Sequence, residues 1–287
     1  MWLLLVTVAT TNLYAQEPVQ EDEIDLLLDD LIFNDQQFVE DILNSFNTYN
    51  FMYTNLSFDS NTFFTGRDSG VDQYNLVPQI AYYSSKGFNV SVSGVYYETY
   101  SPNWNFTNVY LGYYHTIGKK KLFNYSLGYS HYFYSDGWDA FNNTIDVSIG
   151  VRNKRQTLGT KLYASYLFGT DQSFQITSRS FASVTLLRKN TFLLKFRPQL
   201  NFVLAQQTIA LEQLNTQEPM TTTGYVYNDI FDLLNTYVNI PFRLSTRSWD
   251  FELGYNVNFP LPVTGEPDLE PTGYFNLSVG YLIDLGP

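Results

Sequence analysis

Apolar and polar residues alternate along most of the chain, from about residue 49 to its end. In the run from Phe192 to Ala205, one set of alternate positions is entirely apolar, while the other carries lysine, arginine, glutamine and asparagine. Successive side chains of a strand point to opposite faces, so this run predicts a strand with one apolar and one polar face. The runs reach about ten residues, the length that a tilted strand needs to cross a lipid bilayer. The pattern therefore predicts a transmembrane β-barrel.

The alternation recurs often enough to predict about twelve antiparallel strands, and an even number is what a single-chain bacterial barrel requires. Together the strands give an all-β fold, an up-and-down transmembrane β-barrel over residues 47–287. The expected strands cover residues 47–58, 73–84, 87–98, 105–117, 121–134, 141–152, 156–169, 172–188, 190–206, 234–245, 248–259 and 272–285.

Connections between the expected strands alternate in length along the chain. The short connections are Ser85-Lys86, Gly118-Lys119-Lys120, Asn153-Lys154-Arg155, Lys189-Asn190 and Thr246-Arg247. The longer ones cover residues 61–72, 99–104, 135–140, 207–233 and 260–271, with a brief connection at 169–171. Outer-membrane barrels have short periplasmic turns and longer extracellular loops. This order therefore predicts a bacterial outer-membrane protein whose two termini are periplasmic.

Two segments precede the expected barrel. Residues 1–15 have the apolar run and the small final residue that are typical of a secretory signal peptide, although no basic residue precedes the run. Residues 16–46 are acidic and show helical spacing of apolar residues in two stretches. We expect this acidic segment to be periplasmic and to act as a plug or to bind a partner. The residues expected to do so are Ile24, Leu28, Asp29, Asp30, Phe38 and Ile42.

Composition fits a barrel with one face in lipid and one in water. Charged residues make up 15% of the chain and aromatic residues 18%, and the mean hydropathy is -0.19. A helical membrane protein needs about 20 consecutive apolar residues per span, which this chain lacks. The chain has no cysteine, which excludes disulfides and thiol catalysis. The aromatic residues expected in interfacial girdles near strand ends are Tyr97, Tyr113, Tyr132, Phe133 and Trp249.

Charge is sorted along the chain. Ten of the 16 lysine and arginine residues fall in or beside the short connections, and ten of the 28 acidic residues lie in residues 17–41. Both groups are periplasmic in this arrangement, so the acidic segment is expected to dock under or partly into the barrel mouth. Salt weakens exposed ion pairs, so apolar contacts must contribute as well. A mobile acidic tail or a helix that binds a partner is the open alternative.

Residue parity assigns each side chain to the lipid or to the lumen. Positions of the inward parity are rich in asparagine, serine and glycine, as a polar lumen requires. The charged residues expected in the lumen are Asp146, Lys161, Arg179, Lys195, Arg197, Arg243, Asp250, Glu252 and Asp284. Basic residues follow one another on neighbouring strands and acidic residues follow on the next two, which suits a transverse field in a narrow channel. A salt-bridge network that fills a small lumen is the alternative, and we favour it.

No group of residues predicts catalysis. The size of the barrel invites comparison with outer-membrane phospholipase, but His115 and His131 fall near opposite ends of neighbouring strands and cannot form one site. The acidic residues of the expected loops lack a suitably placed histidine to activate water. No phosphate loop, zinc spacing or nucleotide fingerprint occurs, so we expect no cofactor and no metal. The net charge of -12 argues against a nucleic-acid partner.

Four short strings of the chain are Tyr14-Ala15-Gln16, Gly118-Lys119-Lys120-Lys121-Leu122-Phe123, Arg197-Pro198-Gln199 and Tyr281-Leu282-Ile283-Asp284-Leu285. These strings resemble outer-membrane barrels of Bacteroidota, particularly the flavobacterial ones. Strands rich in asparagine and tyrosine extend the resemblance over roughly residues 36–285. It implies a location in the outer membrane. Some barrels of this group are accessory subunits of machines for protein insertion, secretion or nutrient uptake.

The sequence therefore leads to two functions of different kinds. The first, which we favour, is a non-enzymatic accessory subunit that contacts outer-membrane lipid and protein partners in the outer membrane or periplasm. The second is a narrow channel for small polar solutes, which the sorted lumen charges support. An outer-membrane hydrolase is the least supported alternative.

Overall fold

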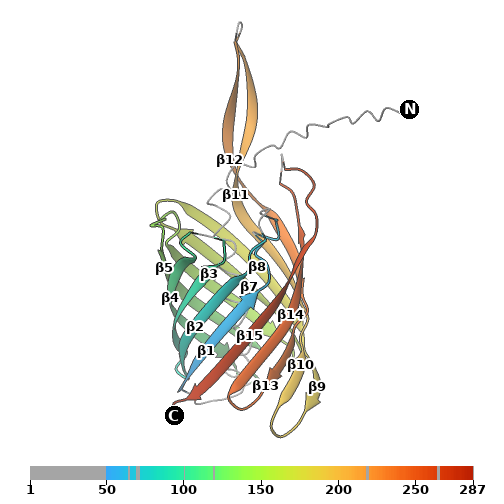
Figure 1. The fold of residues 1–287 in the computed structure, drawn as a ribbon. Helices are drawn as coiled ribbons and strands as arrows, with labels where there is room; N and C mark the ends of the chain where they lie inside the picture. Colours follow the sequence, from blue (N-terminus) through green and yellow to red (C-terminus); the bar gives the residue numbers. More distant parts are fainter. Residues whose placement is uncertain are drawn as a thin grey trace, which may run out of the picture.

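The computed structural model describes residues 50–286 apart from 64, 69–71, 100, 119, 218–219 and 264–265, and over 207–229 it describes the backbone alone. The expected signal peptide and acidic segment lie outside the described residues. The fold is a closed antiparallel β-barrel (Figure 1). Its strands are β1 (Asn50–Asp59), β2 (Asn75–Ser84), β3 (Phe88–Tyr97), β4 (Trp104–Ile117), β5 (Phe123–Tyr134), β6 (Asn143–Arg152), β7 (Leu158–Phe168), β8 (Gln172–Ala182), β9 (Val184–Arg188), β10 (Leu193–Phe196), β11 (Gln199–Gln217), β12 (Met220–Asn239), β13 (Phe242–Ser245), β14 (Trp249–Pro260) and β15 (Thr272–Asp284).

Twelve wall strands close the barrel, and neighbours pair in antiparallel register. The first and last strands complete the wall, because β1 pairs with β15 and Phe51 stands opposite Asp284. Three wall strands are each divided in two: β8 continues as β9, β10 as β11, and β12 as β13. Both β12 and β13 pair with β14, which closes the sheet beside them. The predicted fold class and number of strands are confirmed.

The divisions in these three strands fall on neighbouring parts of the wall. Ser183 separates β8 from β9, Arg197 and Pro198 separate β10 from β11, and Ile240 and Pro241 separate β12 from β13. One hydrogen bond links two of the breaks, since Arg197 N donates to Pro241 O at 3.2 Å. Proline has no N–H to give to a strand ladder, so each proline interrupts the pairing of its own strand.

The long connection predicted at residues 207–233 is wrong. In the structure the described residues of this range belong to β11 and β12, which pair with each other along their whole length. Only residues 199–205 of β11 also pair with β8, and only residues 235–239 of β12 pair with β14. The remainder is a two-stranded hairpin that continues beyond the wall (Figure 1). Because this hairpin is not part of the wall, it does not need the lipid-facing alternation by which the other strands were located.

Each wall strand presents one apolar and one polar face, as residue parity predicted. On β5 and β6 the outward Phe123, Leu127 and Ile149 are more than half exposed, whereas the inward Asn124 and Ser148 are buried. An apolar surface this extensive is unfavourable in water and favourable in lipid. The outer wall is therefore the lipid-facing surface of a transmembrane barrel. Within the described residues, no helix has the length and apolar character required to cross a membrane.

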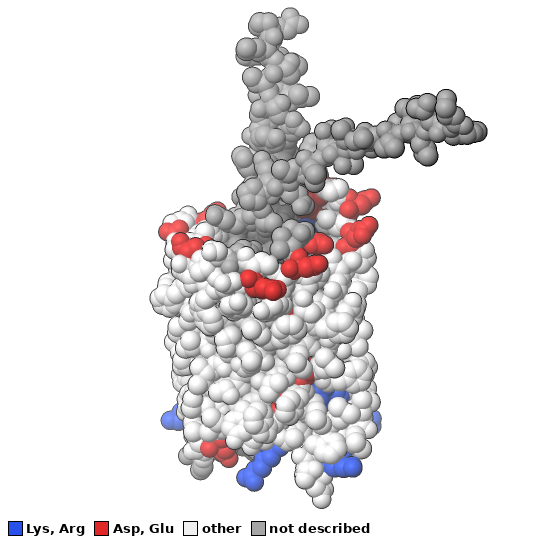
Figure 2. Space-filling view, in the orientation of Figure 1, with Lys and Arg blue, Asp and Glu red and all other residues white. Residues whose placement is uncertain are grey.

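The two ends of the barrel differ in loop length and in charge. Apart from the corrected hairpin, the alternation of short and longer connections is as predicted. The long-connection end is acidic and the short-turn end is mainly basic (Figure 2). Exposed acidic residues at the first are Asp72, Glu98, Asp136, Asp139, Asp171, Asp268 and Glu270. Exposed basic residues at the second are Lys86, Lys120, Lys154, Arg155, Arg188, Lys189 and Arg247.

Large aromatic side chains also enter the lumen. Tyr97 and Tyr132, which we expected in an interfacial girdle, face the interior and are only 2% and 3% exposed. That expectation was wrong, because Tyr132 shares the parity of the inward Ser130 and the alternation already placed it inside. Phe133 and Trp249 are exposed on the outer wall, as predicted.

Candidate lumen site

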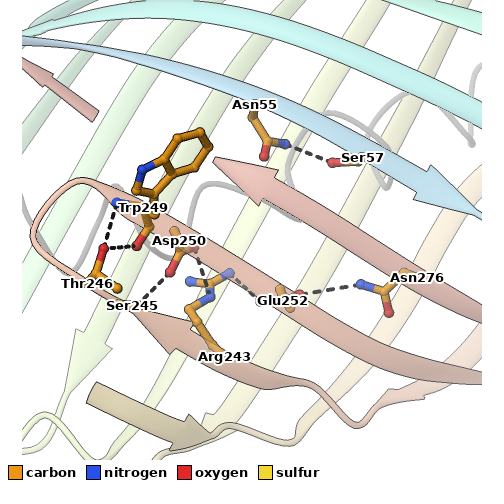
Figure 3. A network of polar contacts seen from close by, with 9 residues as sticks. All are labelled: Asn55, Ser57, Arg243, Ser245, Thr246, Trp249, Asp250, Glu252 and Asn276. Carbon is orange, nitrogen blue, oxygen red and sulfur yellow. Dashed lines mark hydrogen bonds and ion pairs between the residues drawn. The ribbon is translucent and has the colours of Figure 1, made fainter. Parts of the chain in front are cut away.

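An ion cluster lies on the inner face of β13 and β14 (Figure 3). Arg243 stands directly opposite Glu252 in the strand register and forms an ion pair with it. The Nε atom of Arg243 also lies 3.5 Å from Oδ2 of Asp250. Ser245 donates to Asp250 at 2.6 Å, and Asn276 on β15 donates to Glu252 at 3.4 Å. All three charged side chains are buried, so this part of the predicted network exists as an ion-paired cluster.

Four further cations line the neighbouring inner wall, and we call them the lumen stripe. They are Arg152 on β6, Lys161 on β7, Arg179 on β8 and Arg197 at the break between β10 and β11. Each is between 5% and 7% exposed. Lys161 stands directly opposite Arg179, and Arg179 stands directly opposite Asn201. The stripe therefore places positive charge on four consecutive wall strands.

Tyr163 holds two members of the lumen stripe. Its ring centroid lies 4.6 Å from Nζ of Lys161 and 5.6 Å from Cζ of Arg179. A second ring, that of Tyr114 on β4, lies 5.9 Å from the same lysine nitrogen. Arg179 is fixed further by Asn201, whose side-chain oxygen accepts a hydrogen bond from Nε at 3.1 Å. The two cations therefore both contact the ring of Tyr163.

Phe181 holds the other two members in the same way. Its ring centroid lies 3.9 Å from Cζ of Arg197 and 5.4 Å from Cζ of Arg152. The ring reaches Arg152 because it lies across Gly159, the residue that β7 places opposite both Phe181 and Arg152. A Cβ atom at Gly159 would stand 2.6 Å from the ring. Glycine at this position is therefore required for the ring to bridge the two arginines.

The two kinds of contact have different electrostatic consequences. A cation over an aromatic ring gains about 0.5–2 kcal/mol and keeps its full charge. Arg243 instead faces two carboxylates, which cancel its charge locally. The inner wall thus combines cations that contact aromatic rings along the stripe with an ion-paired cluster on β13 and β14.

The remaining charged residues predicted for the lumen lie in three places. Asp146 on β6 is buried and accepts a hydrogen bond from Ser165 at 2.7 Å, nearer the loop end than the stripe. Lys195 on β10 is half-buried and stands opposite Arg243. Asp284 differs from the expectation, because it is the last residue of β15 and lies exposed at the turn-side mouth.

Sequence reasoning placed Lys161, Arg179 and Arg197 in the lumen but did not include Arg152, and it missed the rings that contact these cations. Tyr163 and Phe181 each lie two positions along the strand from a stripe cation, so they share its inward parity. This spacing, an aromatic residue two positions from lysine or arginine, was the available signal. It was overlooked because aromatic residues were assigned to the lipid or to the membrane interfaces.

The two histidines do not meet. His131 stands opposite Val109 on β4, and that residue lies six positions from His115. Six residues of strand span about 20 Å at about 3.4 Å per residue. In the part of the chain that the structure describes, no group of three or more histidine, cysteine, aspartate or glutamate residues could hold a metal ion.

Arg67 joins two of the loops at the long-connection end. Its guanidinium donates to Glu266 at 3.1 Å and to the carbonyl oxygen of Leu261 at 2.9 Å. Arg67 lies between β1 and β2, and Glu266 lies between β14 and β15. The connection between β1 and β2 therefore contributes an arginine that links neighbouring loops.

No protein-family model and no curated protein sequence matches the chain. Among solved structures the chain is similar to the KdgM porin, with 10% identity and a TM-score of 0.46 over 80% of this chain and 98% of that one. It is also similar to LpxR from Salmonella typhimurium, with 8% identity, a TM-score of 0.44 and coverage of 80% and 99%. An outer-membrane channel from Pseudomonas putida F1 is similar as well, with 9% identity and a TM-score of 0.45 over 83% of this chain and 95% of that one. At this level the likeness concerns the barrel alone, and the flavobacterial resemblance stays a prediction.

Proposed function

We propose that the protein is a narrow, non-enzymatic channel that passes small polar solutes across the outer membrane. The observation that carries this proposal is the arrangement of charge in the lumen. Cations occupy four consecutive wall strands, and an ion-paired cluster follows on β13 and β14. Charges fixed on one flank of a low-dielectric passage focus a field across it, which is how a channel selects among solutes.

The number of wall strands limits the size of the solute. Barrels of about 8 strands are filled by their own side chains, whereas barrels of about 16 strands enclose an open aqueous channel. A wall of twelve strands lies between these limits. The burial of inward side chains such as Asn108, Asn201 and Asn239 also favours a closely lined passage over a wide one. We therefore place the solute in the range of small polar molecules and ions.

We also propose an orientation of the barrel in the membrane and a role for the acidic segment. We place the basic short-turn end in the periplasm, together with both termini, and the acidic long-connection end outside the cell. The acidic residues 16–46, including Asp29 and Asp30, are then on the same side as the basic rim. In this arrangement they narrow or block the turn-side mouth through Ile24, Leu28, Phe38 and Ile42.

An accessory subunit of a larger outer-membrane complex is the second candidate. The observation that favours it is the hairpin of β11 and β12. These strands have 19 and 20 residues, whereas β8 has 11 and β14 has 12. A hairpin whose backbone extends this far beyond the wall offers a partner protein a place to bind.

Planar-bilayer recording of the purified full-length chain separates the two candidates. A channel gives reproducible single-channel conductance, and deletion of residues 17–46 increases it if that segment narrows the mouth. Absence of conductance in both forms, together with a stoichiometric partner retained after extraction in mild detergent, would support the accessory subunit instead. A matched chain lacking residues 207–233 should lose such a partner but keep the conductance of a channel.

A further inference from the structure

Strand β9 has an open edge at the short-turn end of the barrel. On one side it pairs with β10 along its whole length, from Val184 to Arg188. On the other side β7 has already ended, because its register with β8 stops where Leu158 stands opposite Ala182. Among the described residues, no strand pairs with this second edge of β9. The hairpin of β9 and β10 therefore extends past the neighbouring turns with one side uncovered (Figure 1).

Backbone hydrogen-bonding groups of β9 point toward this open edge. Ser183 N, just before the strand, donates to Thr157 O at 2.7 Å on the same side. At the other end of the strand, Lys189 N donates to Phe192 O at 2.9 Å and closes the hairpin. Hydrogen-bonded and non-hydrogen-bonded pairs alternate along an antiparallel ladder. The N–H and C=O of Arg188, the residue before Lys189, therefore point away from β10 and toward the open edge.

The side chains of β9 are all exposed. Val184, Leu186 and Leu187 are between 43% and 51% exposed. Leu186 forms a bulge, because the register with β10 passes from Thr185 to Leu187. Short length and bulges protect edge strands against unspecific pairing with long foreign strands. The edge of β9 is therefore suited to a short partner segment that has apolar side chains on one face.

Four basic residues surround the open edge. Arg188 and Lys189 lie at the end of β9, and Lys154 and Arg155 lie in the turn between β6 and β7 that contacts the start of β9. All four are exposed. Within the part of the chain that the structure describes, none of the four forms an ion pair with a carboxylate. Charge complementarity therefore favours a partner segment that carries carboxylates.

A second copy of the chain does not fit this edge. Wall strands of such barrels tilt by about 35–45° from the membrane normal, and β9 continues the wall strand of β8. Two copies inserted in the same direction are related by a two-fold axis along the normal. Their β9 strands would then cross at about 70–90°, whereas paired strands differ in direction by only about 20–25°.

We propose that the open edge of β9 binds a short, extended, acidic segment of another protein by strand addition. Backbone hydrogen bonds to the edge provide affinity, and side chains of the segment provide specificity. Its apolar side chains lie beside Val184 and Leu187, and its carboxylates lie beside the four cations. The proposed orientation makes this partner periplasmic. The inference goes beyond the proposed channel, since it does not depend on conduction, and it concerns the end of the barrel opposite the hairpin of β11 and β12.

The test is the binding of a fluorescent peptide, in which valine alternates with glutamate, to the full-length chain in neutral detergent micelles. Fluorescence anisotropy should show saturable binding that weakens between about 0.1 M and about 1 M salt, because the Debye length falls from about 10 Å to about 3 Å. A peptide in which lysine replaces glutamate should not bind. A fully N-methylated version of the acidic peptide keeps the carboxylates but has no N–H donors. It should bind at least about tenfold more weakly, since two or more hydrogen bonds are lost.

Two single changes in the protein form a matched pair. Arg188→Gln removes a cation beside the edge and should weaken binding by up to about fourfold, the effect of one unit charge about 5 Å away through water. Lys86→Gln removes an exposed cation from the connection between β2 and β3, which is remote from β9 in the strand order. This second change should leave binding unchanged.

The outcomes separate this site from the channel. Equal binding of the N-methylated peptide, or an equal loss in the two protein variants, would show adhesion to the basic rim by charge alone and would overturn strand addition. Absence of binding, both to the full-length chain and to a chain lacking residues 17–46, would overturn it as well. Binding that emerges only after this deletion would assign the edge to the chain's own acidic segment and contradict a separate partner. Conductance is measured independently, so a peptide that does not bind leaves the channel proposal intact.

Discussion

Individual glycines in the lumen wall make room for aromatic rings. Tyr110 on β4 is inward and buried, and its ring lies against Gly112 and Gly128. These two glycines stand directly opposite each other on β4 and β5. A Cβ atom at Gly128 would lie 2.4 Å from the ring of Tyr110. Two facing glycines thus form a flat patch on which one tyrosine can lie.

This patch gives a prediction at the residue scale. Gly128→Ala should destabilise the barrel by about 1–3 kcal/mol, the usual cost of forcing an extra methyl group into a packed interior. Urea unfolding in detergent micelles, followed by tryptophan fluorescence, measures the change in free energy. In a Tyr110→Leu background the same glycine change should cost far less, because the ring that it strikes is gone. Equal costs in the two backgrounds would refute the packing account.

Residue parity explains which side chains could be placed from sequence. It assigned Lys161, Arg179 and Asp250, which are buried in the structure, to the interior because a strand with one face in lipid has no freedom of register. It failed for Asp284, since a side chain at the end of a strand lies at the mouth, whatever its parity. It gave no reason to single out Phe181 among the aromatic residues. The ring of Phe181 reaches Arg152 only because the neighbouring strand has a glycine, Gly159, between them.

At the scale of elements, the loops of the long-connection end form a linked group. Arg67 and Glu266 join the connection after β1 to the connection before β15, two strands that are themselves paired. Glu266 also accepts a hydrogen bond from Val263 N at 2.8 Å. Hydrogen bonds to charged groups contribute about 1.5–3 kcal/mol when partly buried. Because Arg67 and Glu266 both lie in connections and not in wall strands, their ion pair orders the loops more than it stabilises the wall.

Arg67→Ala should accordingly loosen the loops and leave the barrel intact. We expect faster cleavage of residues 60–74 by proteinase K, with little change in the urea midpoint of the wall. Glu266→Gln should have a smaller effect in the same direction, and Asp268→Asn, an exposed acidic residue of the same connection, should have none. Unchanged cleavage in the arginine variant would show that the ion pair does not hold these loops.

The elements themselves were predictable from sequence to the extent that lipid imposed a pattern. All twelve wall strands were located by alternation, because each must present an apolar face to lipid. The extension of β11 and β12 was missed because, beyond the wall, backbone pairing stabilises the strands and no face is obliged to be apolar. The breaks at Pro198 and Pro241 were also missed, since proline counts as apolar in a parity pattern although it interrupts the ladder.

At the scale of the whole molecule, the acidic end and the basic end each have exposed positions from which the orientation of the barrel in the membrane can be measured. The chain has no cysteine, so single cysteines can be introduced without background. Asp136→Cys lies at the acidic end and Lys154→Cys at the basic end, and both positions are exposed. In intact cells a membrane-impermeant maleimide should label the first and spare the second. Both should react after the outer membrane is permeabilised. The reverse pattern in intact cells would invert the proposed orientation.

Closure of the wall by its two terminal strands governs the order of assembly. The residues that pair in β1 and β15 are more than two hundred positions apart, so their contact has one of the largest loop-closure costs in the chain. Until the final 13-residue strand arrives, β1 and β14 each retain an open edge, and open edges recruit foreign strands. The last wall strand in chain order is therefore the one that turns an aggregation-prone ribbon into a sealed cylinder, and the ribbon must be shielded until this strand has paired.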